Sequence, residues 1–308
     1  MRWPVLFFMF ALLALSLMVW RWGGTVEDSQ AYFDTARYFR GELGIEALRA
    51  PFPYRTLVPA IAAALPGDLR QVFAALNWMC MTASACLMTA VALRAGMDGK
   101  RATGAGVLML VSLPTFWYAP YLLVDPGSIL ARSAFVLAVL AGQPWLAALA
   151  GLLGTAVREE NILLLVWLLA TRRISIAGGL AVLAAAGAWL VAVRFWLIPG
   201  LPSYTWVPSW WTVNHALHDV RSLLSIAGAC IPVVPAAILG WRHAPASVKP
   251  LRSLLFLMAL PPLYAALSVR VEGRIVWGLY PFLIPFAAAC GADRAIRRKA
   301  PAGPDQPD

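Results

Sequence analysis

The chain has 308 residues, of which 61% are hydrophobic and only 13% are charged, whereas soluble globular proteins carry roughly 25% charged residues. Its long apolar stretches lack the regularly spaced polar positions that give a soluble helix its hydrated face, so the composition excludes an ordinary soluble domain. The net charge of +10 does not indicate a nucleic-acid partner, because the basic residues lie in short loops without interleaved aromatic rings. We therefore predict an all-α, polytopic transmembrane protein.

Seven apolar runs are long enough to cross a bilayer, whose core of about 30 Å needs about 20 apolar residues in a helix. They are residues 4–22, 72–93, 103–122, 176–198, 223–240, 251–269 and 275–293. We interpret residues 4–22 as an uncleaved anchor rather than a signal peptide, because the segment Arg21-Trp22-Gly23-Gly24 offers no small-x-small cleavage site.

Three shorter apolar runs follow Asp125, at residues 127–142, 144–157 and 161–170. The last two would extend only about 20 Å and about 15 Å as helices, which is too short to cross comfortably. We predict short, broken helices buried among the longer ones. Counted with the seven long runs they give ten membrane segments in a single transmembrane domain over residues 1–293.

Basic residues predict the orientation, because cytoplasmic loops are enriched in Lys and Arg. They follow the second run, the short helices and the last run, and they precede residues 251–269. All four groups are cytoplasmic if each short run is one pass, which also places both termini in the cytoplasm. Residues 294–308, rich in Pro and Asp, read as a disordered cytoplasmic tail. The expected location is the inner membrane of a bacterium.

With this topology most acidic residues gather on the outer side of the membrane. Eleven of the fifteen lie there: Glu27, Asp28, Asp34, Glu42, Glu46, Asp68, Asp125, Glu159, Glu160, Asp219 and Glu272. The orientation was inferred from basic residues, so this gathering of acids is a partly independent result. It is the strongest indication of function in the sequence.

The outer loop of residues 23–70 begins with an amphipathic pattern. Apolar side chains recur at helical spacing from Tyr32 to Leu43, which predicts a helix lying along the membrane surface. Asp28 has two compatible interpretations. In Thr25-x-x-Asp28 it completes a capping box, or it serves, with Glu27, as a general base beside the bilayer.

Two arginines on the outer side suit a phosphate site. Arg55 follows an aromatic and Pro-rich stretch, and it is either an ordinary interfacial side chain or a planar fork for two phosphate oxygens. Arg158 joins the short runs together with Glu159 and Glu160. That turn is either self-neutralising or a set of functional charges held below the outer surface, where charges are costly.

The last outer turn, Arg270-Val-Glu272-Gly-Arg274, holds its arginines at the membrane boundary, either as an exposed salt-bridged hairpin or as part of a site. Asp125 reads as a helix cap. His215 and His218 are spaced loosely for a metal and lack an assigned third ligand.

These residues resemble the GT-C glycosyltransferases, which are integral membrane enzymes that use polyprenyl-phosphate sugars. The likeness lies in an acid pair after the first helix, a loop returning through residues 54–59, the Arg158-Glu159 turn, and Glu272-Gly-Arg274 before Tyr280-Pro281. The resemblance implies a donor that is a polyprenyl-phosphate-linked sugar in the membrane lipid. The acceptor would be an extracytoplasmic glycan, lipid or protein. No cofactor is required by it, and a divalent metal is compatible with it but not indicated.

The resemblance also implies roles for individual residues. Asp28 would be the general base on the acceptor hydroxyl, with Glu27 as its partner and Asp34 as a second acid. The leaving phosphate needs charge stabilisation, which the resemblance assigns to three arginines oriented by two glutamates. These residues are Arg55, Arg158, Arg274, Glu159 and Glu272.

Two other functions stay open. A lipid-linked-saccharide flippase or transporter would be supported by internal repeats and by midplane charges in both halves, and the sequence shows no clear repeat. A non-catalytic scaffold of a cell-envelope complex would tolerate loss of Asp28 or Arg158. No P-loop, Gly-x-Ser-x-Gly or His-Glu-x-x-His motif occurs.

Overall fold

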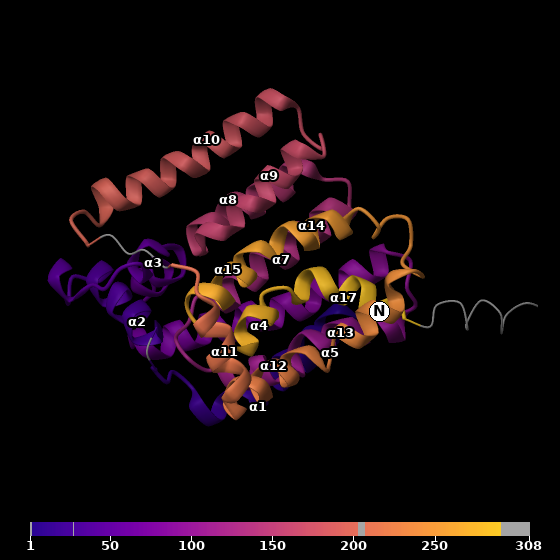
Figure 1. Cartoon of the computed structure of the whole chain (residues 1–308), viewed down its shortest axis with the longest axis horizontal. Coiled ribbons are helices and arrows are strands. Elements are labelled where there is room, and N and C mark those ends of the chain that lie inside the picture. The colour runs from indigo at the N-terminus through magenta and orange to yellow at the C-terminus, as the bar shows by residue number, and fades with distance from the viewer. Residues whose placement is uncertain (1, 27, 203–206, 291–308) are drawn as a thin grey trace, which may run out of the picture.

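The computed structural model describes residues 2–26, 28–202 and 207–290, and this part of the chain is helical without any strand (Figure 1). The helices are α1 (Trp3–Met18), α2 (Asp28–Phe39), α3 (Leu57–Ala64), α4 (Leu69–Arg94), α5 (Gly99–Leu110), α6 (Leu113–Tyr118), α7 (Asp125–Leu140), α8 (Pro144–Val157), α9 (Ile162–Ala170), α10 (Ile176–Ala192), α11 (Trp210–His218), α12 (Val220–Cys230), α13 (Val234–Trp241), α14 (Leu251–Met258), α15 (Leu260–Ser268), α16 (Gly273–Trp277) and α17 (Tyr280–Ala288). The all-α prediction is confirmed. The predicted tail, residues 294–308, and Glu27 lie outside the described residues.

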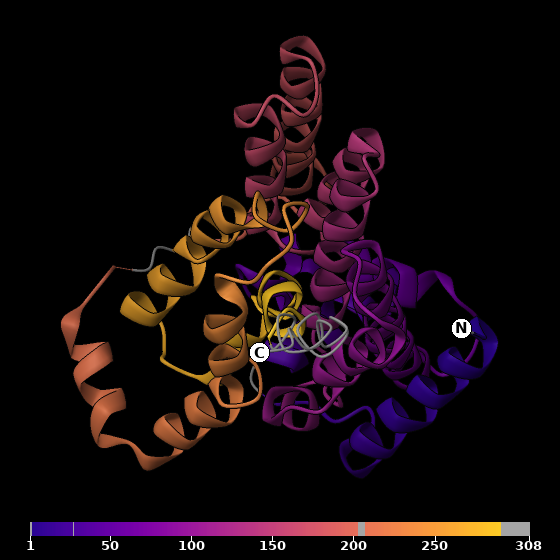
Figure 2. The same cartoon turned by 90° about the vertical axis from the view of Figure 1, so that its right-hand side faces the viewer.

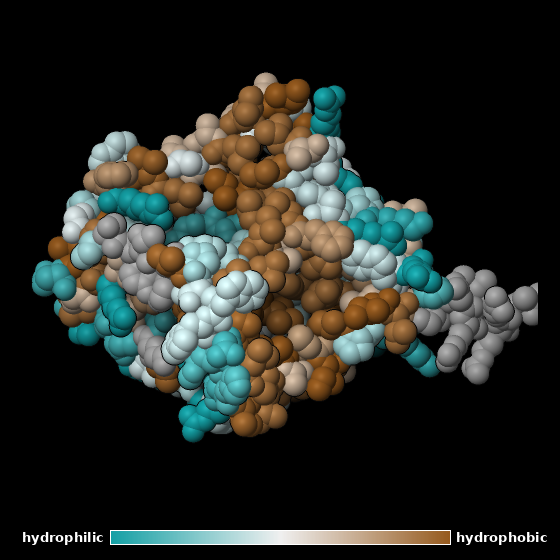
Figure 3. All heavy atoms as spheres, in the orientation of Figure 1, coloured by the Kyte–Doolittle hydropathy of each residue, from teal (hydrophilic) through white to brown (hydrophobic). Residues whose placement is uncertain are grey.

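Among the described residues, four helical segments are long and apolar enough to cross a membrane: Trp3–Arg21, Leu69–Arg94, Ile176–Leu197 and Leu251–Ser268. A fifth forms if α12 and α13, which meet at a bend of 43°, count as one span. Figure 3 shows an apolar band crossing the molecule between two more hydrophilic ends. The chain is therefore a helical membrane protein by these criteria, and ten passes stay a prediction.

Two runs predicted as continuous segments are broken. Residues 103–122 divide into α5 and α6 because Ser112 caps α6 through the Thr115 amide, and Pro114 lies in its first turn. Residues 275–293 begin with the short helix α16, and Pro281 starts α17. Proline has no amide hydrogen to donate, so it starts a helix more readily than it continues one. Both breaks place side chains at an end of the bundle.

The bundle packs closely at small residues, as membrane helices generally do. The core lies along α4, the longest helix, against α1, α5 and α7. At Gly106 of α5 an added Cβ would lie 2.4 Å from the ring of Phe10 and 2.8 Å from the carbonyl of Ala85. At Gly240 of α13 it would lie 1.9 Å from the carbonyl oxygen of Phe286 in α17. These glycines bring the helix backbones into contact.

The amphipathic helix α2 exists, but its environment differs from the prediction. Tyr32 and Ala36 are fully buried and pack with Val58 of α3 and Phe73 of α4. The apolar face of α2 is covered by protein rather than laid on the membrane surface. The prediction missed this because burial against α3 and burial in lipid require the same sequence pattern. As a result α2 is fixed to the bundle, with Asp28 at its first position.

Helix α10 has the opposite character. It packs mainly on α8 and α9 at the edge of the molecule, where these helices project from the rest (Figures 1 and 2). Only 17% of its most apolar 18-residue stretch is buried inside the protein. Such exposure suits a helix that faces lipid.

Candidate functional site

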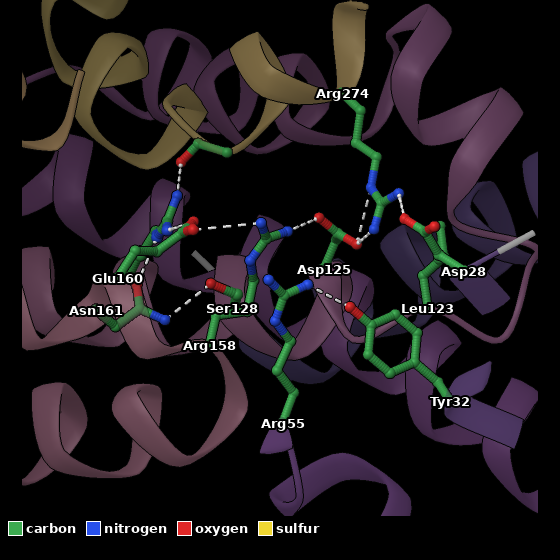
Figure 4. Close-up of polar contacts among 12 residues, drawn as sticks. Asp28, Tyr32, Arg55, Leu123, Asp125, Ser128, Arg158, Glu160, Asn161 and Arg274 are labelled. Atoms are coloured by element: carbon green, nitrogen blue, oxygen red, sulfur yellow. Dashed lines mark hydrogen bonds and ion pairs between the residues drawn. The ribbon is translucent and has the colours of Figure 1, made fainter. Parts of the chain in front are cut away.

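Charged side chains from five separate stretches meet at one end of the bundle (Figure 4). Arg274 of α16 donates from Nε and Nη2 to Oδ2 of Asp125, at 3.1 Å and 2.8 Å. Its Nη1 donates to Oδ2 of Asp28, at 2.8 Å. One guanidinium therefore joins the start of α2 to the start of α7.

The network continues across α7. Arg158 donates to Asp125 and, at 3.3 Å, to Oε2 of Glu160. Arg132 donates from Nη2 to Oε1 of Glu160 at 2.6 Å and from Nε to Asn161 at 2.7 Å. Asp125 and Glu160 each lie between two arginines, so the charges alternate in sign along the cluster.

Arg55 forms a branch of the same cluster. Its Nε donates to Oε2 of Glu159 at 3.0 Å, and its Nη1 donates to the hydroxyl oxygen of Tyr32. Within the described part of the chain, Arg55 Nη2 has no hydrogen-bond partner. This leaves one guanidinium edge available beside the carboxylates.

Local sequence explains how α7 presents its charges. Asn77 of α4 donates to the carbonyls of Tyr121 and Leu123, each at 2.9 Å, and this fixes the chain just before α7. Pro126 favours helix initiation there. Arg132 follows Asp125 by seven residues, or two helical turns, so both side chains lie on the same face.

The turn after α8 presents the remaining charges. Arg158 ends α8 in an extended conformation, with φ −148° and ψ 128°, and the chain then forms a 3-10 turn, Glu159–Asn161. Asn161 is fully buried and donates at 2.9 Å both to the carbonyl of Gly154 and to Ser128. These bonds fix the turn against α7, so it is neither an exposed loop nor a cap for its own helix alone.

The cluster is costly to bury and therefore depends on its pairing. The side chain of Arg132 is 3% exposed and that of Asp125 is 7% exposed. Removing such a charge from water costs on the order of several kcal/mol per ion, and this cost must be offset by opposite charges and hydrogen bonds. Arg158 Nε is buried and has no hydrogen-bond partner in the described part of the chain. Charges held at such cost within a membrane protein usually serve its function.

The glutamates differ in their electrostatics. Burial opposes ionisation of Glu160, but the guanidiniums of Arg158 and Arg132 outweigh it and lower its pKa to about 2. Burial raises the pKa of Glu272, although Arg274 and Arg270 act in the opposite direction. Glu160 is therefore a fixed anion, whereas Glu272 takes up a proton more readily than an ordinary glutamate.

The low pKa of Glu160 predicts a loss of stability in acid. Its folded-state pKa of about 2 lies below the ordinary value of 4.5, so its contribution is present above pH 4.5 and is lost as the pH falls toward 2. We expect the thermal midpoint of the detergent-solubilised protein to fall across this window. Glu160→Gln should flatten the dependence, whereas Glu46→Gln, a change of an exposed side chain between α2 and α3, should leave it unchanged. Equal profiles for wild type and Glu160→Gln would contradict the assignment.

A cavity of about 520 Å³ opens over this cluster. One wall is apolar and comes from α15, where Pro261, Pro262 and Ala265 line it. Arg49 and Arg270 are exposed and lie at its edge. Because α15 belongs to the candidate span Leu251–Ser268, the cavity joins a charged floor to a membrane helix.

Most residues predicted from sequence meet in this cavity. It is lined by Asp28, Arg55, Arg158, Glu159, Glu272 and Arg274. Asp34 is an exception, because its carboxylate lies on another side of α2, near Gln30 at 2.8 Å and Arg37 at 3.8 Å. The other predicted acid, Glu27, lies outside the described residues.

The structure gives Glu272 a partner that the sequence did not indicate. Its Oε2 accepts a hydrogen bond from the Tyr118 hydroxyl at 3.2 Å, and the charges of Arg274 and Arg270 also act on its carboxylate. The same hydroxyl lies 3.3 Å from Ser225 Oγ, which also accepts from the amide of Gly273. Glu159 does pair with Arg55, as expected.

Sequence reasoning did not select the residues that bind the cluster together. Asp125 was read as a cap, yet its carboxylate holds Arg158 and Arg274. Arg132 was given no role, and Glu160 was noted only as one of the charges in the turn after residues 144–157. The seven-residue spacing from Asp125 to Arg132, and the four-residue spacing from Asp28 to Tyr32, could have identified two inward-facing helix faces.

His215 and His218 contact other residues of α11. His218 Nδ1 lies 2.8 Å from the carbonyl of Asn214, and His215 stacks on Trp211. Among the described residues no group of three or more His, Cys, Asp or Glu is placed to hold a metal ion.

Comparisons of the chain with protein-family models, with curated proteins and with solved structures find no match. The assignment of a function therefore depends on the residues of the cavity.

Proposed function

We propose that this protein is a membrane glycosyltransferase that moves a sugar from a polyprenyl-phosphate donor to an extracytoplasmic acceptor, with inversion. The observation that carries the proposal is the meeting of Asp28 with three arginines, Arg55, Arg158 and Arg274, in one cavity beside a membrane helix. A carboxylate and several guanidiniums are the groups that this chemistry needs. One removes a proton, and the others stabilise a departing phosphate.

Asp28 fits the role of general base better than the other acids. Its side chain is 34% exposed, against 7% for Asp125 and 22% for Glu160. Its Oδ2 accepts from Arg274, and Oδ1 accepts no hydrogen bond from any described residue. Asp125 and Glu160 each bind two arginines, so their oxygens are occupied. Asp28 alone among these three offers an uncommitted oxygen to the cavity.

The reaction balances without a further reactant. The acceptor hydroxyl oxygen bonds to the anomeric carbon while its proton passes to Asp28. The bond from that carbon to the phosphate oxygen breaks, and its electron pair leaves with polyprenyl phosphate. Arg55 supplies charge to that phosphate through Nη2, which has no hydrogen-bond partner among the described residues. Attack opposite the leaving group inverts the anomeric carbon.

The proposal includes an orientation. The cavity faces the extracytoplasmic side of a bacterial inner membrane, and the chain crosses ten times with both termini in the cytoplasm. The support is the distribution of Lys and Arg in short loops.

The direct test is an assay of the purified protein with polyprenyl-phosphate sugars and a panel of glycan, lipid and protein acceptors. We expect a new glycosidic bond, release of polyprenyl phosphate, and an inverted anomeric configuration by NMR. Folded wild-type protein that transfers no sugar across the panel would overturn the proposal. Movement of a lipid-linked saccharide across liposomes without a new bond would favour a flippase instead.

A further inference from the structure

Five basic residues gather at the end of the bundle that is opposite the charged cavity. They are Arg172 and Arg173 after α9, Arg242 after α13, and Lys249 and Arg252 at the start of α14. In Figure 1, α13 and α14 lie on the side of the molecule away from α2 and α3. The candidate span Leu251–Ser268, whose other end lines the cavity through Ala265, has 18 residues. It rises about 27 Å, close to the bilayer core of about 30 Å, so these basic residues lie at the opposite membrane boundary.

Contacts of two tryptophans connect the three helices at this boundary. Trp167 of α9 is buried and donates from Nε1 to Ser253 Oγ of α14 at 3.0 Å. The guanidinium of Arg173 lies over the ring of Trp167, 5.0 Å from its centroid. That of Arg252 lies over Trp241 of α13, also at 5.0 Å, and donates to the carbonyl oxygen of the same residue. Two guanidiniums are therefore held against indole rings where α9, α13 and α14 meet.

These cations lack the acidic partners that neutralise the arginines of the cavity. Among the described residues, none of the five forms an ion pair with an aspartate or a glutamate. Burial lowers the pKa of Arg173, and no neighbouring acid acts against this effect. Arg252 Nε is buried and has no hydrogen-bond partner in the same part of the chain. The surface therefore carries uncompensated positive charge that an anion would neutralise.

The backbone of Arg172 provides an independent observation. Its φ is +51°, and it is the one residue with positive φ, other than glycine, in the described ranges. Glycine adopts this left-handed conformation without the steric cost of a Cβ atom, and it is the usual residue just after the end of a helix. Arg172 occupies that position after α9, and its side chain is exposed. The chain therefore keeps a cation where the backbone favours glycine.

An exposed apolar stripe continues from these cations toward the middle of the membrane. It consists of Phe256, Leu260 and Leu263, which follow Arg252 at spacings of four, four and three residues and therefore share one face of α14 and α15. Each of the three side chains is more than half exposed. Positive charge at the membrane boundary, followed by an apolar surface along the helix, matches a phospholipid with an anionic head.

We propose that the end of α9, the end of α13 and the start of α14 bind the head of an anionic phospholipid, with an acyl chain along the apolar stripe. Arg173 and Arg252 contact the phosphate, because the planar guanidinium fork matches its oxygens, and the other three cations supply further charge. Basic pockets between membrane helices on the cytoplasmic side suit such heads, in agreement with the orientation proposed above. The site does not depend on sugar transfer.

Lipid binding to the delipidated full-length protein in detergent tests the site. The probes are phosphatidylglycerol and phosphatidylethanolamine with the same acyl chains, and binding is measured by native mass spectrometry and by the thermal midpoint. We expect phosphatidylglycerol to bind at least about fivefold more tightly and to raise the midpoint, because it carries a net negative charge. Equal binding of the two lipids would overturn the proposal. So would an equal rise in the midpoint with inorganic phosphate, which would indicate a site for a free anion.

Arg172→Gly separates lipid binding from folding. The substitution removes one cation and relieves the positive φ, so the thermal midpoint without added lipid should equal or exceed that of the wild type. The affinity for phosphatidylglycerol should nevertheless fall at least about threefold, and at least about tenfold when Lys249→Gln is added. A structural role alone would leave the affinity unchanged. Wild-type affinity in the double variant would overturn the proposal.

The matched control removes two cations from another turn that the sequence places on the same side of the membrane. Arg94→Gln combined with Lys100→Gln changes exposed side chains at the end of α4 and the start of α5, with the same change in net charge. This variant should keep the wild-type affinity for phosphatidylglycerol. An equal loss of affinity would mean that the lipid responds to the overall charge of this face, which would overturn a site at α9, α13 and α14.

Discussion

Replacement of Asp28 by asparagine is expected to lower the kcat of sugar transfer at least about 100-fold, because a positioned general base typically contributes about 10²–10⁴-fold. Asparagine keeps the size of the side chain but cannot accept the proton of the acceptor hydroxyl. The fold should survive, since the side chain is 34% exposed and, among the residues that the structure describes, makes an ion pair with Arg274 alone. Transfer by protein purified from membranes is the measurement.

The matched control is Asp34→Asn, the same change on the same helix. Asp34 contacts Gln30 and Arg37 and does not line the cavity, so this variant should keep wild-type activity. If Asp28→Asn retained more than a tenth of the wild-type activity, this result would contradict the role of Asp28 as general base. If both variants also supported the biological role of the protein in cells, this result would favour a non-catalytic scaffold.

The second large effect concerns stability. Asp125→Asn should lower the free energy of unfolding by about 3–5 kcal/mol, the usual cost of removing one partner from a buried ion cluster. The carboxylate of Asp125 balances two guanidiniums, those of Arg158 and Arg274, and is 7% exposed. Without this charge, Arg158 and Arg274 each lose one of their two carboxylate partners. Thermal unfolding of the detergent-solubilised protein measures the change.

Asp98→Asn provides the control for this prediction. Asp98 caps α5 by accepting from the amides of Lys100 and Arg101, and asparagine caps a helix about as well as aspartate. We expect little change in the unfolding midpoint. A decrease below about 1 kcal/mol for Asp125→Asn, comparable with a surface ion pair, would mean that the cluster contributes little to the fold.

The helices could be predicted from the sequence because apolar run length is a local signal. Residues 144–157 form α8 at the predicted bounds, and residues 176–198 correspond to the candidate span Ile176–Leu197. The broken runs also carried a local signal that was not used, since Ser112 followed by Pro114 is typical of a helix start. Local patterns thus account for the elements and for some of their breaks.

The pairing of charges could not be predicted in the same way. Asp125 and Arg274 are 149 positions apart, and Tyr118 and Glu272 are 154 apart. Which acid meets which arginine depends on the packing of α7 against α17 and of α16 against α6 and α12, and no spacing in the sequence reports this. The sequence could have distinguished Asp28 from Asp34, because two side chains six residues apart on a helix point in well-separated directions.

The long separation between Asp125 and Arg274 has a consequence for biogenesis. During synthesis the segment that carries Asp125 is made long before α16, and Arg158, only 33 positions later, is the first of its two ion-pair partners to be made. Arg274 completes the arrangement when the last helices insert, and it is also the group that holds Asp28. A nascent chain that stops before α16 would therefore lack the guanidinium that joins Asp125 to Asp28.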